Sequence, residues 1–213
     1  GNALGGAGGN ILISSGGADG KSASGYIAIH SGSGNEKGGI LIMKSGRSDI
    51  GSSGDVSIAS GSGVVSGNIK VSTGSASAGS SGAIKLETGA SAEGFAGSIS
   101  FIGGNSFERG SDLVFKSGYS VNDVGGTLLL DAGRSQNGRG GAIQMSGGAS
   151  TKVTGGEVRL KSGSSDTGVS GAVHIATAVG AKSGKVLLAS GDADTSSGSV
   201  QIGTGKSQLS NSG

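Results

Sequence analysis

The feature that most constrains this chain is a short motif that recurs from one end of it to the other. In its clearest copy, residues 82–89, it reads Gly-Ala-Ile-Lys-Leu-Glu-Thr-Gly, so that apolar Ile84 and Leu86 alternate with polar residues and a glycine closes each end. Alternation with a period of two is typical of a strand that buries only one face. Glycine marks the places where a chain turns. The motif therefore predicts a short strand bounded by turns.

The sequence contains fourteen copies of this motif, numbered here in chain order, at spacings of 13 to 16 residues and most often 15. A regular period of this kind, without a shift in composition, predicts one repeat array over residues 1–213. We interpret it as part of a longer array. The aliphatic or aromatic pairs that define the copies are Ile11/Ile13, Ile27/Ile29, Leu41/Met43, Val56/Ile58, Ile69/Val71, Ile84/Leu86, Ile99/Phe101, Leu113/Phe115, Leu128/Leu130, Ile143/Met145, Val158/Leu160, Val173/Ile175, Val186/Leu188 and Val200/Ile202.

The loops between the pairs contain a position that holds only small side chains, two residues past the glycine that closes each strand. A position of this kind is expected on the inside of a turn, where serine can hydrogen-bond the local backbone and glycine can take a positive φ. Its members are Ala18, Ser48, Ala76, Ser91, Ser106, Ser120, Ser135, Ser150, Ser165 and Ala193.

Composition predicts an all-β chain. Glycine destabilises a helix interior by about 1 kcal/mol relative to alanine, and this chain has 49 glycines and no apolar spacing of three and four. Gly/Ser-rich chains are commonly flexible linkers, but a linker has no reason to place aliphatic residues in pairs. A parallel β-solenoid and an antiparallel meander both fit short strands with similar loops. We favour the parallel β-solenoid because stacked coils require a near-constant repeat length.

The number of repeats in each coil follows from the outward charges. One repeat per coil would stack Lys70 directly on Lys85, and like charges in that position are destabilising. Two repeats per coil separate them and let the aliphatic faces of two sheets meet across about 10 Å. The expected fold is therefore a solenoid of fourteen strand-loop repeats, about 15 residues each, with two facing sheets; one repeat per coil remains the alternative.

The sequence shows no set of residues typical of catalysis, cofactor binding or metal binding. His30 and His174 lie at outward strand positions without a second metal ligand at a suitable spacing, and Asp192 and Asp194 lie in a loop where aspartate commonly forms turns. The formal charge is +2, from 16 basic and 14 acidic residues that are scattered along the chain. Scattered charge does not predict nucleic-acid binding. No apolar run reaches the roughly 18 residues of a membrane span.

The repeat array resembles the Gly/Ser-rich tandem-repeat β-solenoids of surface and extracellular fibrous proteins. Its 14- to 15-residue period is also similar to that of the head domains of trimeric autotransporter adhesins. Those heads follow a different pattern of Ser, Ala-x-Gly and Asn turns, so no functional residue is carried over. The resemblance implies an extracellular or cell-surface location.

The sequence favours a structural or assembly protein, a rigid extracellular rod or filament subunit that self-associates. Exposed apolar patches commonly mark contact surfaces. With two repeats per coil, outward aliphatic residues gather on the odd-numbered copies. We call this predicted surface the outward stripe: Leu12, Ile40, Ile42, Ile102, Leu129 and Leu187.

The alternative is a binding module that uses a flat β-face to bind ice, a polysaccharide or another cell-surface polymer. Ice-binding faces typically carry ranks of threonine, whereas the outward ranks here mix Lys, Gln, Ser, Leu and Arg. Polysaccharide sites favour aromatic platforms, and Tyr26 and Tyr119 are far apart in the sequence. The sequence favours self-association over this alternative and predicts no enzyme activity.

Overall fold

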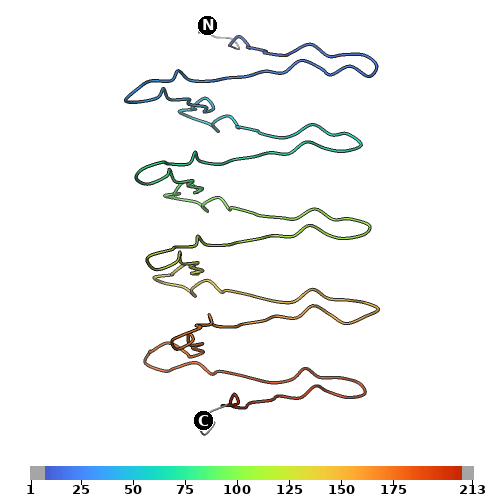
Figure 1. Ribbon diagram of the computed structural model, residues 1–213, viewed down its shortest axis with the longest axis vertical. Helices are drawn as coiled ribbons and strands as arrows, with labels where there is room; N and C mark the ends of the chain where they lie inside the picture. The colour runs from blue at the N-terminus through green and yellow to red at the C-terminus, as the bar shows by residue number, and fades with distance from the viewer. Residues whose placement is uncertain (1–7, 208–213) are drawn as a thin grey trace. The chain divides into compact units, whose positions relative to one another are not determined.

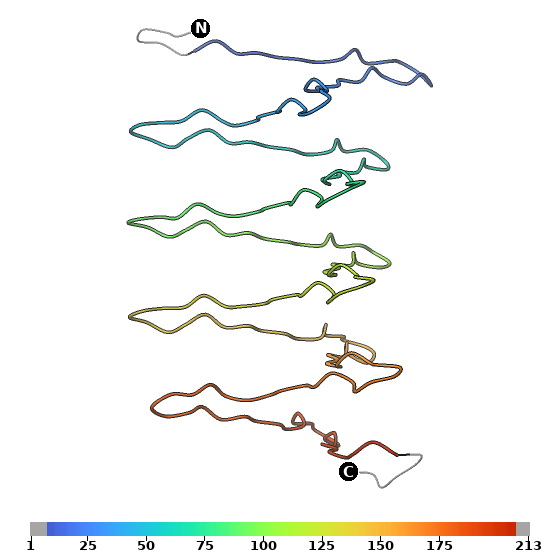
Figure 2. The same cartoon turned by 60° about the vertical axis from the view of Figure 1, so that its left-hand side comes forward.

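A computed structural model of the protein describes residues 8–207. These residues contain no helix and no strand. Figures 1 and 2 show extended segments that reverse direction at turns. The chain divides into two units, Gly1–Phe101 and Ile102–Gly213. The boundary lies inside the seventh copy of the motif, and the same local pattern is present in both units.

The turns lie where the glycines and small residues predict them. One bend occurs between each two successive aliphatic pairs of the described chain, so the spacing of the motif is also the spacing of the turns. The stretches between bends, which carry the pairs, are extended. The bends lie at residues 20–22, 35–36, 49–51, 63–65, 77–79, 92–94, 107–108, 121–123, 136–138, 151–153, 166–168, 180–182 and 194–195.

The predicted parallel β-solenoid with two facing sheets is wrong, because residues 8–207 contain no strand and therefore no sheet. Facing sheets about 10 Å apart would keep the two ends of each loop separated. Instead, in eight loops the backbone N–H of the residue that opens one segment donates to the carbonyl of the glycine that closes the segment before it. These donor–acceptor pairs, 2.8 to 3.4 Å apart, are Gly25/Gly16, Gly39/Gly32, Gly54/Gly46, Ser111/Gly104, Gly126/Gly118, Gly141/Gly133, Gly156/Gly148 and Gly171/Gly163.

These hydrogen bonds make two successive segments leave a loop side by side, as they would in a hairpin. No ladder continues from them along the described segments, because none of those residues is in a strand. The antiparallel meander considered as an alternative is therefore not formed either. The loop ends are closed by hydrogen bonds, and the extended segments between them form no strands within residues 8–207.

The expectation that the aliphatic pairs form a buried core is also wrong. No residue among those described is buried, and the Ile84 side chain is 53% exposed. The chain is most closely packed at the loops instead. The partly buried residues are Ser45, Gly103, Ser117, Ser120, Ala132 and Ser162, and all of them except Ser120 directly precede a glycine that closes a segment.

The alternation predicted from the motif is present in the extended segments. Leu129, at the outward middle position of its segment, is 80% exposed, against 56% for Leu128 and 63% for Leu130. Ion pairs also join residues two positions apart: Lys85 Nζ lies 2.5 Å from Glu87 Oε2. Because residues i and i+2 of an extended chain point to the same side, each segment has an aliphatic face and an outward face, and neither face is buried.

Candidate functional site

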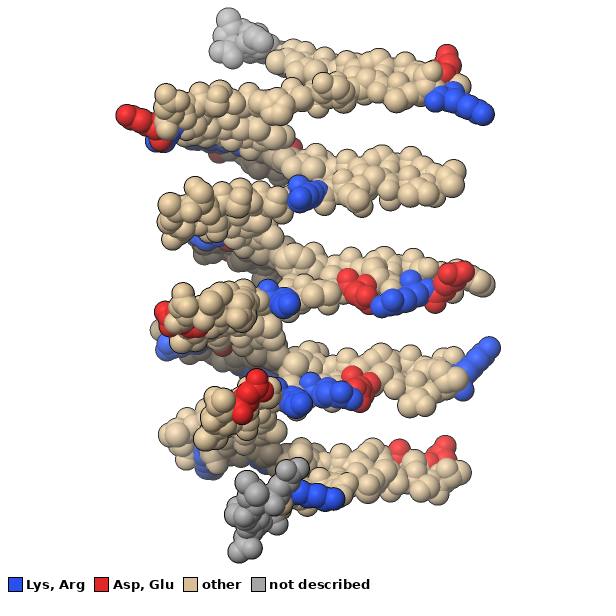
Figure 3. All heavy atoms as spheres, viewed as in Figure 1, with Lys and Arg blue, Asp and Glu red and all other residues tan. Residues whose placement is uncertain are grey.

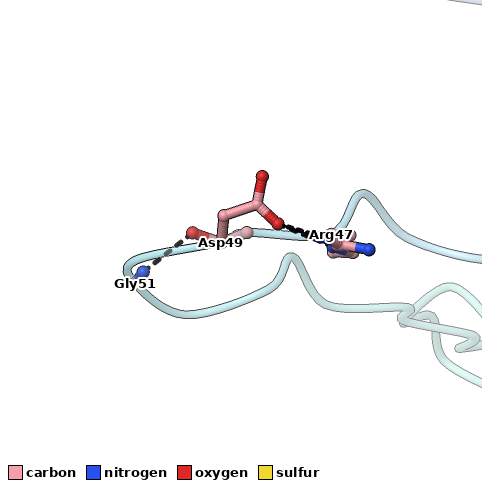
Figure 4. Close-up of polar contacts among 4 residues, drawn as sticks. Arg47, Asp49 and Gly51 are labelled. Carbon is pink, nitrogen blue, oxygen red and sulfur yellow. Dashed lines mark hydrogen bonds and ion pairs between the residues drawn. The ribbon is translucent and has the colours of Figure 1, made fainter.

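Seven of the thirteen turns are held by the serines at the small-residue position. The Oγ of every serine at that position accepts a hydrogen bond from a backbone N–H two or three residues further along, at 2.8 to 3.4 Å. Figure 4 shows one such loop, in which the N–H of Gly51 donates to Ser48 Oγ while Arg47 and Asp49 form an ion pair. These contacts confirm the prediction that serines at this position hydrogen-bond the local backbone.

Two of the loops that carry alanine at this position turn in a different way. Alanine has no oxygen to accept the N–H, and Ala18 and Ala76 are followed by Gly20 and Gly79, whose φ angles are 78° and 86°. These are the positive-φ residues of the described chain. Only glycine takes this conformation without strain. Two kinds of turn therefore account for nine of the thirteen bends: seven are held by a serine side chain and two depend on a left-handed glycine.

Replacing Gly79 with alanine should destabilise its turn by about 1–2 kcal/mol, because an L-residue is strained in the left-handed region. Gly74→Ala in the same loop is the matched control, since a Cβ at either glycine meets no atom within 4 Å and only Gly79 has a positive φ. Amide hydrogen exchange across residues 74–82 measures the difference. Equal exchange rates in the two variants would contradict the assignment of a left-handed turn.

We call the residue before a closing glycine and the residue that opens the next segment the loop base. In the loops on either side of the ninth copy, one side chain fills this base and leaves little room for a second. A Cβ added at Gly126 would lie 3.2 Å from Ser117 Cβ, and one added at Gly141 would lie 3.4 Å from Ala132 Cβ. Between the seventh and eighth copies the glycine and the larger residue exchange places. Gly103 precedes the closing glycine, and Ser111 opens the next segment. There Ser111 Oγ donates to the carbonyl of Gly104 at 2.9 Å. The sequence interpretation missed this pairing, although the exchanged glycine and serine were a visible signal of it.

Replacing Gly126 with alanine should weaken the loop base by about 1 kcal/mol, the typical net contribution of one hydrogen bond. The added Cβ would lie 3.1 Å from the backbone nitrogen of Gly118, whose carbonyl accepts the N–H of Gly126 at 3.0 Å. Gly118→Ala is the control, because a Cβ there meets no atom within 4 Å. Hydrogen exchange of the residue 126 amide measures the effect, and adding Ser117→Gly should recover part of it.

The residues of the outward stripe are all open to solvent, with exposed fractions between 72% for Leu187 and 89% for Leu12. Leu12, Ile40 and Ile42 belong to unit Gly1–Phe101, and the other three belong to unit Ile102–Gly213. The structure brings Ile40 and Ile42 together on one segment, and the remaining residues lie on separate segments.

The aliphatic pairs provide a larger exposed surface, which the sequence interpretation had assigned to a core. From the second copy to the fourteenth, the first members of the pairs are between 49% and 56% exposed, with Ile99 the lowest. Apolar side chains exposed on this scale are unusual in monomers and typically mark contact surfaces. The candidate functional site therefore comprises the aliphatic pairs on one face of the segments and the outward stripe on the other.

Charged side chains are spread among the segments and loops. Figure 3 shows Lys and Arg beside Asp and Glu on the visible face, with no extended area of one sign. The ion pairs found among the described residues are exposed and join residues two or three positions apart in the sequence. They are Arg47–Asp49, Lys85–Glu87, Arg109–Asp112 and Glu157–Arg159.

The residues considered for other kinds of chemistry are not brought together. His30 lies in one unit and His174 in the other, as do Tyr26 and Tyr119. Within residues 8–207 there is no pocket and no group of three or more side chains able to hold a metal ion. The same residues include no helix that is long and apolar enough to cross a membrane.

Comparison of the chain with protein-family models, characterised proteins and solved structures finds no match.

Proposed function

We propose that this chain is a structural protein that self-associates into a rod or filament, outside the cell or at its surface. The supporting observation is that every described segment exposes its aliphatic pair while no described residue is buried. The proposed location is supported by the resemblance to Gly/Ser-rich fibrous proteins of surfaces and extracellular structures.

Energetics favour a partner for these segments. Fixing the backbone of one residue costs about 1–2 kcal/mol, and burial of apolar side chains is the main term that offsets this cost. Burying one Val, Leu or Ile side chain contributes about 1.5–3 kcal/mol. Because the described residues form no core, the apolar burial that would stabilise this conformation has to come from contacts with other molecules.

A second copy of the chain fits these faces best. The seven pairs of each unit provide 14 side chains, a large share of the roughly 20–30 residues that a stable interface commonly uses on each side. A second copy presents the same pairs at the same spacing. The formal charge of +2 on 213 residues gives little repulsion between copies. No observation in the described residues favours the alternative polysaccharide- or ice-binding module, which remains a prediction.

Sedimentation velocity over a wide range of protein concentration tests this proposal, with electron micrographs of the same samples. Self-association should give species many times heavier than the 20.0 kDa chain, and these should appear as rods or filaments. A sample that remains at the mass of one chain at high concentration would rule out the proposed function.

A further inference from the structure

We infer that a second copy of this chain docks on the aliphatic pairs at any offset of whole repeats, so that the assembly has no single register. Register here means which repeat of one copy lies against which repeat of the other. The inference rests on the proposed self-association and specifies its geometry.

The first basis for this inference is that the aliphatic faces are equivalent. The first members of the pairs differ by only a few per cent in exposure, from 49% at Ile99 to 56% at Leu128, in copies two to fourteen. By exposure, none of these pairs is distinguished from the others as a specific docking position.

The second basis is the spacing. Successive pairs from Leu113 to Val173 are each separated by 15 residues. A copy displaced by one, two or three repeats in this region again places pair against pair. The departures from 15 residues elsewhere fall between the motifs, in loops, and surface loops are the parts of a chain that best tolerate changes in length. Spacing therefore allows many offsets.

The third basis is that some of the outward charges are already paired within their own segment. Proteins commonly fix register by pairing charges across an interface. Here Lys85 is paired with Glu87 at 2.5 Å, and Arg159 with Glu157 at 2.6 Å, each within its own segment. Charges that are neutralised locally gain little from a charged residue on a second copy.

Pairing at a whole-repeat offset has a consequence for the size of the assembly. An offset pair of copies leaves uncovered repeats at both ends, and these can bind further copies. Contacts between different surfaces that do not close on themselves generate open filaments rather than closed dimers. The assembly is therefore open-ended and lacks a fixed number of chains.

Single-cysteine variants test the inference cleanly because the chain has no cysteine. Ser57, Ser100 and Gln144 occupy the middle position of the fourth, seventh and tenth copies, three repeats apart from one to the next. Assembled Gln144→Cys chains are mixed with differently tagged Gln144→Cys, Ser100→Cys or Ser57→Cys chains. The mixtures are then treated with a thiol cross-linker that is long enough to join cysteines on the outward faces of two copies whose aliphatic faces are in contact. The same mixtures dispersed in concentrated urea give the background.

Cross-linking should exceed the background in all three combinations, with yields within about threefold of one another because each offset leaves many repeats in contact. Cross-linking above background in fewer than three combinations would overturn the inference while leaving the proposed self-association in place. Chains that sediment as single molecules before cross-linking would overturn both.

Discussion

Replacing Leu129 and Leu187 together with lysine should remove the contacts made by the outward stripe and shift the assembly toward the 20.0 kDa chain. Both residues belong to the outward stripe, and Leu129 is 80% exposed in the isolated chain. Burying one leucine contributes about 1.5–3 kcal/mol, so loss of both contacts should weaken association by about a hundredfold or more. Sedimentation velocity at a fixed concentration measures the result.

The matched control is the double variant Gln144→Lys and Gln201→Lys. These residues occupy the same middle position of the motif in the tenth and fourteenth copies, and the change adds the same two positive charges. The control should assemble like the parent chain. If both double variants disperse, charge repulsion rather than loss of apolar contact is responsible. If neither disperses, the stripe is not an interface.

Replacing Ile84 with alanine should weaken assembly but leave the dispersed chain unchanged. The Ile84 side chain is 53% exposed in the single chain, so its truncation creates no cavity there. In the assembly the same face would be covered, and the loss of about 2 kcal/mol of apolar burial should raise the concentration required for assembly roughly thirtyfold. Light scattering during dilution measures that concentration.

Lys85→Ala is the control for Ile84, because Lys85 lies on the opposite face of the same segment. Its ion pair with Glu87 is exposed, and exposed ion pairs contribute little to stability. This variant should assemble at the same concentration as the parent. An equal effect of the two substitutions would show that the aliphatic and outward faces have been assigned wrongly.

The local structure of the chain could be predicted from its sequence. Serines such as Ser165 indicated where turns form, and its Oγ accepts the N–H of Gly168 at 2.8 Å. Alternation correctly placed Leu128 and Leu130 on the less exposed face of their segment and Leu129 on the more exposed one. These features depend on residues within a few positions of one another, and short-range patterns specify such contacts.

The pairing of segments could not be predicted in the same way. Alternation assigns a side chain to a face but does not say which segment covers that face. The segment that contains Ile84 has thirteen similar segments in its own chain, and a second copy offers more. A stacked solenoid also required the loop ends to stay apart, whereas Gly126 N and Gly118 O lie 3.0 Å apart. The candidate site was identified only in part, because the aliphatic pairs were assigned to a core.

The loop base at Gly103 and Ser111 has its glycine and serine exchanged relative to the neighbouring loops. This exchange affects where the array can lengthen by duplication of its coding sequence. Duplicating residues 126–140 would place Ala132 opposite a new Gly126, and this combination already fits the loop base. Duplicating residues 111–125 would instead place Ser117 opposite a new Ser111, which puts two side chains where Ser117 now faces a glycine. We expect added repeats to be tolerated readily after the ninth copy and poorly after the eighth.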